Sequence, residues 1–568
     1  MLSNPADYTT LIDPVVAGPA ASDPDALALV FIAEDGTRTR VTRGELRAEV
    51  MRHAGALAAL DLRAGDVIVL VMGHSPALVP AFFGAMALGA APCIFSYPSE
   101  RMDVGVYAQR VRSVVENSGA RAVLTSSGLA GELRALLGNE GCPIVDADAL
   151  PRSTAPATAS LARPAPDGVA FLQYTSGTTD LPKGIPHTHA SVIAYLTAKV
   201  SHLRFQPGDV VVSWVPLYHD MGLLSSLLAP LAVGIPTVLM SPFHWVRDPK
   251  ILLHAVQEFR GTFTPLPNFA LNHCARTIRD RDLEGLDLAH WRIVGVGGEP
   301  VRQASLEMFS ERFGRYGLKA TALMPGYGMA ENVEVATASP REQPPRVDWV
   351  RAQELHAEGR AVPATPRQPG VSAIVSCGHP IAGSEVAIID SQGQRLPERR
   401  VGEVAIRSPY RFHGYHRRPD LTARALRDGW FMSGDLGYMA DGELYVCGRT
   451  KDLVIVGGRN VYPEDVEMLV EAVPGLRPGR AVAFGVEDAA LGSERLVFVC
   501  EVVGALDEGQ RTAIVRELRR RAAQELDVVL SEVRLVDPGW VIKTSNGKLA
   551  RSANRDRYAA EYHAPQAP

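Results

Sequence analysis

Short apolar runs bounded by turn residues recur along the first 450 residues of the chain. Examples are residues 67–72, Ala122–Thr125, Thr237–Met240, Ile293–Val296 and residues 401–406. These runs have the length of buried strands, and they alternate with segments of helical pattern. Such alternation is typical of parallel or mixed sheets covered by helices. We therefore expect an α/β fold in residues 1–450, with several layers and mixed sheets.

The pattern changes after residue 450. Short strands are expected at residues 453–456, 481–484, 496–503 and 533–535, and they alternate with two helices. One helix is expected at residues 512–526, where apolar side chains form a stripe at Ile514, Leu518, Ala522 and Leu526. We predict a second, small α+β domain over residues 451–568.

Two segments are rich in proline and in small or polar residues, namely residues 151–167 and 339–370. Both are predicted to be loops or linkers. The second is long for a loop within a compact domain, and loops of that length are often functional.

Two uncharged stretches, residues 67–99 and 221–246, raise the question of a membrane span. Glycine and proline residues interrupt both, whereas a span needs about 20 continuous apolar residues. Buried strand and helix segments are the better interpretation. The N-terminal residues contain Asp7 and Asp13 and lack a cationic stretch followed by an apolar run, so they do not predict a signal peptide.

The composition is that of an ordinary globular protein: 568 residues, 46% hydrophobic, 21% charged and a net charge of -5. It argues against disorder and against nucleic-acid binding driven by overall positive charge. The six cysteines are dispersed, without the close pairs of a zinc cluster or a disulfide framework. We expect a cytoplasmic protein that neither spans a membrane nor binds nucleic acid.

Lysine is rare in this chain. Of the 58 cationic residues only seven are lysine. Four of these, Lys183, Lys451, Lys543 and Lys548, lie in glycine-containing segments. A position that stays lysine in an arginine-rich chain can require a compact ammonium on a flexible stem, although codon bias with chance survivors is the alternative.

A loop rich in hydroxyl groups follows an apolar run at residues 169–172. It reads Tyr174-Thr-Ser-Gly-Thr-Thr-Asp-Leu-Pro-Lys183-Gly184. Backbone N–H groups, hydroxyls and the Lys183 ammonium of such a loop can surround phosphate oxygens. It is not a Walker A loop, because Gly184 stands where a Mg²⁺-binding Ser or Thr is required. The alternative is a flexible Ser/Thr-rich loop.

Six further segments follow in order along the chain. They are Pro216-Leu-Tyr-His-Asp-Met-Gly222, Gly297-Gly-Glu-Pro300, Tyr327-Gly-Met-Ala-Glu331, Ser433-Gly-Asp-Leu-Gly437, residues 448–460 and residues 543–548. With the loop, they resemble the adenylate-forming superfamily of acyl-CoA synthetases, luciferases, peptide-synthetase adenylation domains and fatty acyl-AMP ligases. The resemblance covers nearly the whole chain. It implies an enzyme that uses ATP and Mg²⁺ to activate a carboxylic acid as an acyl-adenylate, releases pyrophosphate and passes the acyl group to a thiol.

The resemblance also implies roles for individual residues. Glu331, a hard oxygen ligand, would hold Mg²⁺. Tyr327 would stack on adenine, Asp435 would bind the ribose hydroxyls, and Arg449 would support the ribose or phosphate. On the residues alone, each of these four has a structural alternative in a core tyrosine, a turn aspartate or a surface ion pair. The full set expected to bind ATP is Thr175, Ser176, Gly177, Thr178, Thr179, Lys183, Gly298, Glu299, Tyr327, Gly328, Asp435 and Arg449.

By the same resemblance, Lys548 places a cation between the two anions that react, the carboxylate and the α-phosphate. Lys451 matches the position about which the C-terminal domain turns after the acyl-adenylate forms, so this small domain is expected to be mobile. The turn would withdraw Lys548 and present the Gly457-Gly458 face to the thiol.

Three features resemble fatty acyl-AMP ligases more than acyl-CoA synthetases. They are the segment with His219 and Asp220, Ala330 in place of the usual Thr, and residues 339–370 at the position of an inserted segment. We expect His219 and Asp220 in the substrate pocket. Phe243, Trp245, Phe263 and Phe269 could line it or belong to the core.

The favoured interpretation is a fatty acyl-AMP ligase that loads the phosphopantetheine thiol of an acyl carrier protein, in lipid metabolism or in polyketide or other natural-product biosynthesis. A CoA-dependent ligase and, less favoured, an amino-acid-adenylating enzyme remain open. A nucleotide-binding regulatory protein without activity is disfavoured, because Lys548, Glu331 and Asp435 are all present.

Overall fold

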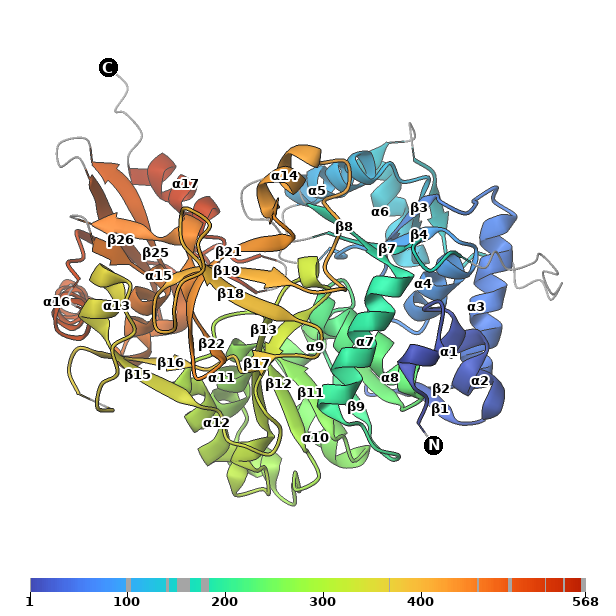
Figure 1. Cartoon of the computed structure of the whole chain (residues 1–568), viewed down its shortest axis with the longest axis horizontal. Coiled ribbons are helices and arrows are strands. Elements are labelled where there is room, and N and C mark those ends of the chain that lie inside the picture. Colours follow the sequence, from blue (N-terminus) through green and yellow to red (C-terminus); the bar gives the residue numbers. More distant parts are fainter. Residues whose placement is uncertain are drawn as a thin grey trace.

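The computed structural model describes residues 2–98, 104–138, 142–150, 164–174, 183–366, 368–456, 459–488, 493–526, 528–544 and 547–562. Within these residues, helices cover parallel, antiparallel and mixed sheets, which confirms the α/β class. In Figure 1 the N-terminal elements lie on the right and the C-terminal elements on the left, with the largest sheet between them.

The largest sheet has nine strands in the order β17-β14-β13-β12-β11-β9-β10-β1-β2. Its middle strands, from β13 to β1, run parallel, while β2 and β14 are antiparallel to their neighbours. Parallel strands expose their carboxyl ends along one edge, where α/β proteins bind ligands. The strands are β1 (Leu27–Ile32), β2 (Arg38–Thr42), β9 (Val211–Ser213), β10 (Thr237–Met240), β11 (Phe263–Leu266), β12 (Ile293–Val296), β13 (Leu323–Gly328), β14 (Val335–Ala338) and β17 (His379–Pro380).

A second, parallel sheet has the order β4-β3-β5-β6 and comprises β3 (Val67–Val71), β4 (Ala91–Ile94), β5 (Ala122–Thr125) and β6 (Ile144–Asp146). Helix α4 (Leu78–Ala87) is buried along its length and packs against α3 (Arg43–Ala58). Gly84 permits this contact, since a Cβ there would lie 2.5 Å from the Cβ of His53. The apolar segments β3, α4 and β4 are therefore protein interior.

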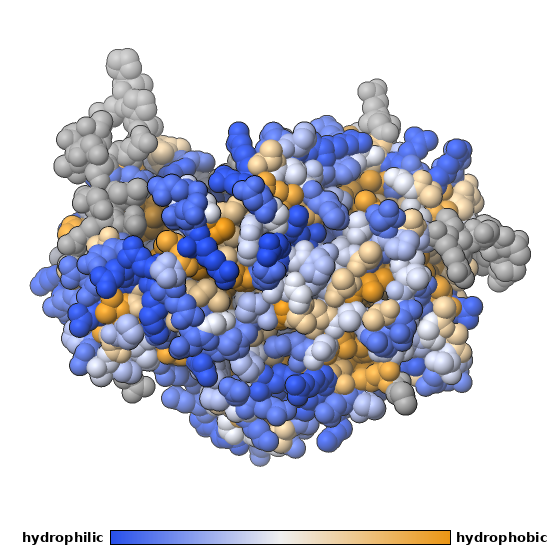
Figure 2. Space-filling model, viewed as in Figure 1, coloured by the Kyte–Doolittle hydropathy of each residue, from blue (hydrophilic) through white to orange (hydrophobic). Residues whose placement is uncertain are grey.

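Helices surround these two sheets. The longer ones are α5 (Val104–Ser118), α6 (Ser127–Leu137), α7 (His189–Leu203), α10 (Lys250–Glu258), α11 (Asn268–Thr277) and α12 (Gln303–Gly314). The π-helix η2 (Met221–Leu228) follows β9 and is wholly buried. No described helix has the length and apolar character needed to cross a membrane. On the face shown in Figure 2, hydrophobic residues form scattered patches among hydrophilic ones.

A third sheet contains β18 (Glu385–Ile389), β19 (Gly402–Arg407), β20 (Leu426–Arg427), β21 (Trp430–Ala440) and β22 (Glu443–Arg449). Strands β21 and β22 form an antiparallel pair in which Asp435 is opposite Arg449. The short 3-10 helix η6 (Thr450–Asp452) follows and contains Lys451. The division of the chain at residue 450 stays a prediction.

The C-terminal elements enclose a hydrophobic cluster of their own. They comprise β23 (Val454–Val456), β24 (Arg459–Val461), α15 (Pro463–Glu467), β25 (Leu476–Asp488), β26 (Ser493–Val502), α16 (Glu508–Glu525), β27 (Glu532–Val536) and α17 (Arg551–Tyr562). Helix α16 begins four residues before the expected start at residue 512, because Asp507 and Gln510 form a capping box.

Residues 339–370 were expected to form a loop, and here the prediction was wrong. The segment contains β15 (Val347–Arg351) and α13 (Ala352–Glu358), and β15 pairs with β16 (Val371–Val375). Leu355 and Val350 are buried in a cluster with Tyr438 and Tyr445, so the segment packs on the third sheet. The proline-rich composition of the segment predicted a loop and gave no indication of this strand and helix.

Candidate functional site

The segments singled out in the sequence meet at the carboxyl ends of four neighbouring parallel strands. His219 follows β9, Phe269 follows β11, Glu299 follows β12, and Tyr327 lies at the end of β13. Because these strands are adjacent, residues more than 100 positions apart in sequence share one crevice.

Tyr327, Asp435 and Arg449 form a hydrogen-bonded chain. The Tyr327 hydroxyl donates to Asp435 Oδ2 at 2.7 Å, and Arg449 Nε donates to Asp435 Oδ1 at 2.9 Å. Burial, together with the nearby Asp435 carboxylate, raises the pKa of Tyr327 well above its usual value. The carboxylate of Asp435 is thus oriented by two donors, in a position where it can accept from further hydroxyl groups.

Glu331 belongs to a second group, with Tyr415 and Lys183. The Tyr415 hydroxyl donates to Glu331 Oε1 at 2.8 Å, and Lys183 Nζ lies 5.1 Å from the centre of the Tyr415 ring. Burial raises the pKa of Glu331, while Tyr415 and Lys183 oppose that shift. Lys183 directly precedes β8 (Gly184–Thr188), and its ammonium acts on the carboxylate of Glu331.

His219 and Asp220 are paired at the start of η2. His219 Nδ1 lies 2.6 Å from Asp220 Oδ1, and the Met221 N–H donates to Asp220 Oδ1 at 2.7 Å. Burial alone would raise the pKa of Asp220, but His219 and Lys548 hold it at about 2. Asp220 is therefore an anion that already has a close partner in His219 and a cation, Lys548, nearby.

A pocket lies beside these groups. Its wall includes Lys548 from the C-terminal part of the chain, together with Trp214, Val215, Pro216, His219, Met221, Pro267, Phe269, Gly298 and Glu299. Burial lowers the pKa of the Lys548 ammonium, and Arg449 adds to this effect. The carboxylates of Asp220, Glu299 and Asp435 oppose it. Lys548 thus faces the crevice at the ends of the parallel strands.

Two glycines permit close approach within the crevice. A Cβ at Gly328 would lie 1.8 Å from the carbonyl oxygen of Glu334. Gly298 has φ +78°, and a Cβ there would meet the methyl group of Met221 at 3.2 Å. Gly328 therefore has no room for a side chain, and the left-handed backbone of Gly298 favours glycine.

Glu299 lies in the pocket wall and accepts a hydrogen bond from the Phe269 N–H at 2.6 Å. Burial raises the pKa of Glu299. Of the four aromatic candidates, Phe269 lines the pocket, and Trp245 stacks behind Trp214 with ring centres 3.8 Å apart. Phe263 is buried in the core, and Phe243 is exposed.

Some predicted residues lie outside the described part of the chain. These are Thr175, Ser176, Gly177, Thr178 and Thr179, with Gly457 and Gly458. Lys451 lies in η6 and is exposed.

Sequence reasoning missed Tyr415 and Trp214. Tyr415 touches Glu331 across 84 positions of sequence, and Trp214 adjoins a recognised segment without belonging to it. No local spacing indicates either residue, because only the folded chain brings them to the crevice.

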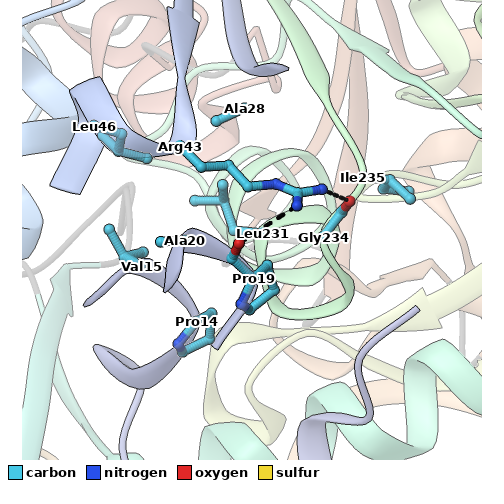
Figure 3. Close-up of a pocket in the computed structure, with 10 residues that line it drawn as sticks. All are labelled: Pro14, Val15, Pro19, Ala20, Ala28, Arg43, Leu46, Leu231, Gly234 and Ile235. Carbon is cyan, nitrogen blue, oxygen red and sulfur yellow. Dashed lines mark hydrogen bonds between the residues drawn. The ribbon is translucent and has the colours of Figure 1, made fainter. Parts of the chain in front are cut away.

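A second, smaller pocket lies among the N-terminal helices, away from these residues (Figure 3). Arg43 crosses it and donates to the carbonyl oxygens of Gly234 at 2.5 Å and of Pro19 at 3.5 Å. Both carbonyls lie at helix ends, in α2 (Gly18–Ser22) and after α8 (Ala229–Val233). The guanidinium thus serves to join these two helices.

Comparison with known proteins gives a family match over most of the chain. The model of the AMP-binding enzyme family matches residues 17–416. A 4-hydroxyphenylalkanoate adenylyltransferase of Mycobacterium marinum is 33% identical over 91% of this chain and 84% of its own. The medium-chain-fatty-acid–[acyl-carrier-protein] ligase JamA of Moorena producens is 36% identical over 69% of this chain and 68% of its own. A solved structure from work on fatty acyl-adenylate ligases of E. coli and L. pneumophila covers all of both chains at 30% identity, with a TM-score of 0.91.

Proposed function

The chain belongs to the AMP-binding enzymes, and from this premise we propose that it converts a fatty or related carboxylic acid and ATP into an acyl-adenylate and pyrophosphate, and then loads the acyl group onto the phosphopantetheine thiol of a carrier protein. The observation that carries the first step is the position of Lys548. A lysine from the C-terminal part of the chain lies in the same pocket wall as His219 and Glu299 of the large sheet's crevice.

In the proposed reaction the substrate carboxylate attacks the α-phosphate, and the bond to pyrophosphate breaks. Tyr327 supplies an aromatic face for adenine, and Asp435, oriented by Tyr327 and Arg449, accepts from the ribose hydroxyls. The Lys548 ammonium stands between the carboxylate and the phosphate and stabilises the charge that accumulates in the transition state. Lys183 offers its cation to the phosphates from the end of the loop.

Mg²⁺ fits the donor set, because Glu331 offers a hard carboxylate beside Lys183, and Mg²⁺ is usually held by one or two carboxylates together with substrate phosphates. When bound, the ion would offset the negative charge of the phosphates. Glu331 is the residue that would hold it, and the hydrogen bond from Tyr415 fixes the carboxylate for that purpose.

A turn of the C-terminal part about Lys451 would then withdraw Lys548 and admit the thiol. In the described arrangement, contacts oppose such a turn. Asp465 of α15 lies 3.3 Å from Arg302 Nη1 and 3.3 Å from His356 Nε2, and His356 belongs to α13 of the inserted segment. A carrier protein could supply the binding energy needed to break these contacts, whereas CoA offers mainly a nucleotide. The carrier specificity named for JamA supports this choice of acceptor.

The acid is proposed to be a fatty or aryl-alkanoic acid. The pocket wall is largely apolar and includes Trp214 and Phe269, and one relative is named for 4-hydroxyphenylalkanoates. An α-amino acid is disfavoured, because Asp220, the acid that would pair with its ammonium group, already contacts His219. Exchange of labelled pyrophosphate into ATP, measured with each class of acid, tests the first step. Loading of a phosphopantetheinylated carrier protein compared with CoA tests the second.

A further inference from the structure

We propose that Glu334 and Lys199 are positioning residues for adenylation: their buried ion pair holds a strained turn at Val333 that aims Glu331 into the crevice, and it ties this turn to the π-helix that carries Met221. The inference rests on the proposed function and adds to it residues that lie outside the segments recognised in the sequence.

The ion pair is fully hydrogen-bonded. Lys199 Nζ donates to Glu334 Oε2 at 2.9 Å, to Ser225 Oγ at 2.6 Å and to the Tyr195 hydroxyl at 3.1 Å. An ammonium has three donors, so all are used. Glu334 also accepts from Tyr195 at 2.9 Å and from Ser225 at 2.5 Å. The side chains of Lys199 and Glu334 are each 7% exposed. This arrangement fixes the Glu334 carboxylate from two sides.

The residue before Glu334 has a strained backbone. Val333 has φ +66° and ψ −55°, and the Glu334 N–H donates to the Asn332 carbonyl at 2.8 Å. This is a γ-turn of the rare form with positive φ. A β-branched residue is an outlier there, and such strain persists only where the surroundings impose it. The anchored Glu334 is such a constraint.

Glu331 lies within the loop that this turn closes. The Met329 N–H donates to the Glu334 carbonyl at 2.6 Å, so residues 329–334 form a loop closed at its base. Glu331 projects from the loop to its hydrogen bond with Tyr415. If Val333 relaxed to negative φ, the loop would open and the Glu331 carboxylate would change direction. Glu334 therefore acts on the site through Glu331.

The same network reaches the pocket by a second route. Ser225 lies in η2, one turn beyond Met221, and Met221 lines the pocket and packs on Gly298. π-Helices are uncommon and often occur at functional sites. Ser225 thus links the middle of η2 to Glu334, so the helix that carries Met221 and the turn that carries Glu331 are held in a fixed relative position.

Stability alone does not explain this ion pair. A buried ion pair can often be replaced by apolar side chains of similar volume at little cost, whereas removal of one partner is costly because a charge is left unpaired. What an apolar pair cannot supply is a defined orientation for the backbone at Glu334. This difference separates a positioning role from a structural one.

The test compares the double variant Lys199→Met with Glu334→Leu against the wild-type enzyme. We expect a melting temperature within a few degrees of wild type, a fall in kcat for acid-dependent pyrophosphate exchange of about ten- to a hundredfold, and faster amide hydrogen exchange in residues 329–335. The matched control is Asp209→Asn, which breaks the ion pair with Arg292 away from the crevice. It should lower the melting temperature without changing kcat or KM.

Glu334→Gln serves as a second variant, since it keeps the shape and removes only the charge. We expect a fall in kcat in the same direction, with folding retained. Wild-type kcat and wild-type hydrogen exchange in either folded variant would overturn the inference. Failure of the proposed function gives a different result, namely a wild-type enzyme with no acid-dependent exchange.

Discussion

Gly547 lies against the ring of Phe269: a Cβ added to Gly547 would meet Phe269 Cε1 at 3.5 Å. Gly547 adjoins Lys548 in the C-terminal part of the chain, and Phe269 lies in the first turn of α11 beside the large sheet. The Thr544 N–H also donates to the Lys548 carbonyl at 2.8 Å. With these two contacts, Lys548 and Phe269 lie in the same pocket wall, where the ammonium can act on a bound substrate.

Lys548→Ala should lower the rate of adenylation by about two to three orders of magnitude, as expected for the loss of one donor to transition-state charge. Transfer from a supplied acyl-adenylate to the thiol should persist, because the lysine is withdrawn in that step. Arg555→Ala, which removes an exposed cation from α17, is the control and should leave both steps unchanged. Equal loss of both half-reactions would contradict the assignment, as would near wild-type adenylation.

The pH dependence of adenylation should show the lowered pKa of Lys548. The reaction needs the protonated ammonium, and the pKa of this group lies below its usual 10.5 because of burial and Arg449. Activity should therefore be full below the lowered pKa and fall as the pH rises through it. The transfer step should not show this fall in activity at high pH, and neither should the residual adenylation by Lys548→Ala. If Lys548→Ala still lost adenylation activity at high pH, the titration would belong to another group.

Asp435→Asn should raise the KM for ATP by about ten- to a hundredfold, because the ribose loses a charged acceptor and Arg449 loses its partner. Asp441→Asn, in the exposed turn between β21 and β22, is the matched control. Steady-state kinetics with ATP varied will measure the effect. An unchanged KM for ATP in Asp435→Asn would remove Asp435 from the ribose site.

The contacts of Asp465 predict a change in acceptor. His356→Ala and Asp465→Asn weaken the link between α13 and α15, so they should raise acyl-CoA formation while adenylation stays near wild type. A preference of about 3 kcal/mol for the described arrangement would lower the population of the arrangement that admits the thiol roughly a hundredfold. Loss of one contact should remove part of that preference. Arg351→Ala, an exposed change in the same segment, is the control. Unchanged acyl-CoA formation would show that this segment does not select the acceptor.

The sequence allowed prediction of the α/β class and of the segments that meet in the crevice, because strand patterns and glycine-rich motifs are local. Asp435 and Tyr327 were identified separately, yet their hydrogen bond depends on the packing of two sheets. Tyr415 was missed for the same reason, since it lies 84 residues from Glu331 and no local sequence pattern predicts their contact.

Other features could not be predicted because they depend on tertiary packing. Lys199 and Glu334 are 135 residues apart, and in sequence each looks like a surface charge. Residues 347–358 form a strand and a helix, although proline and polar residues around them indicated a loop. Burial of Val350 and Leu355 against Tyr438 outweighed that local signal.

The most direct test of the account is exchange of labelled pyrophosphate into ATP, with Mg²⁺ present and a panel of fatty acids from about C4 to C18, aryl-alkanoic acids and amino acids. We expect exchange that depends on a fatty or aryl-alkanoic acid, needs Mg²⁺, and falls by about two to three orders of magnitude in Lys548→Ala. Absence of exchange with every acid, together with absence of ATP binding, would contradict it.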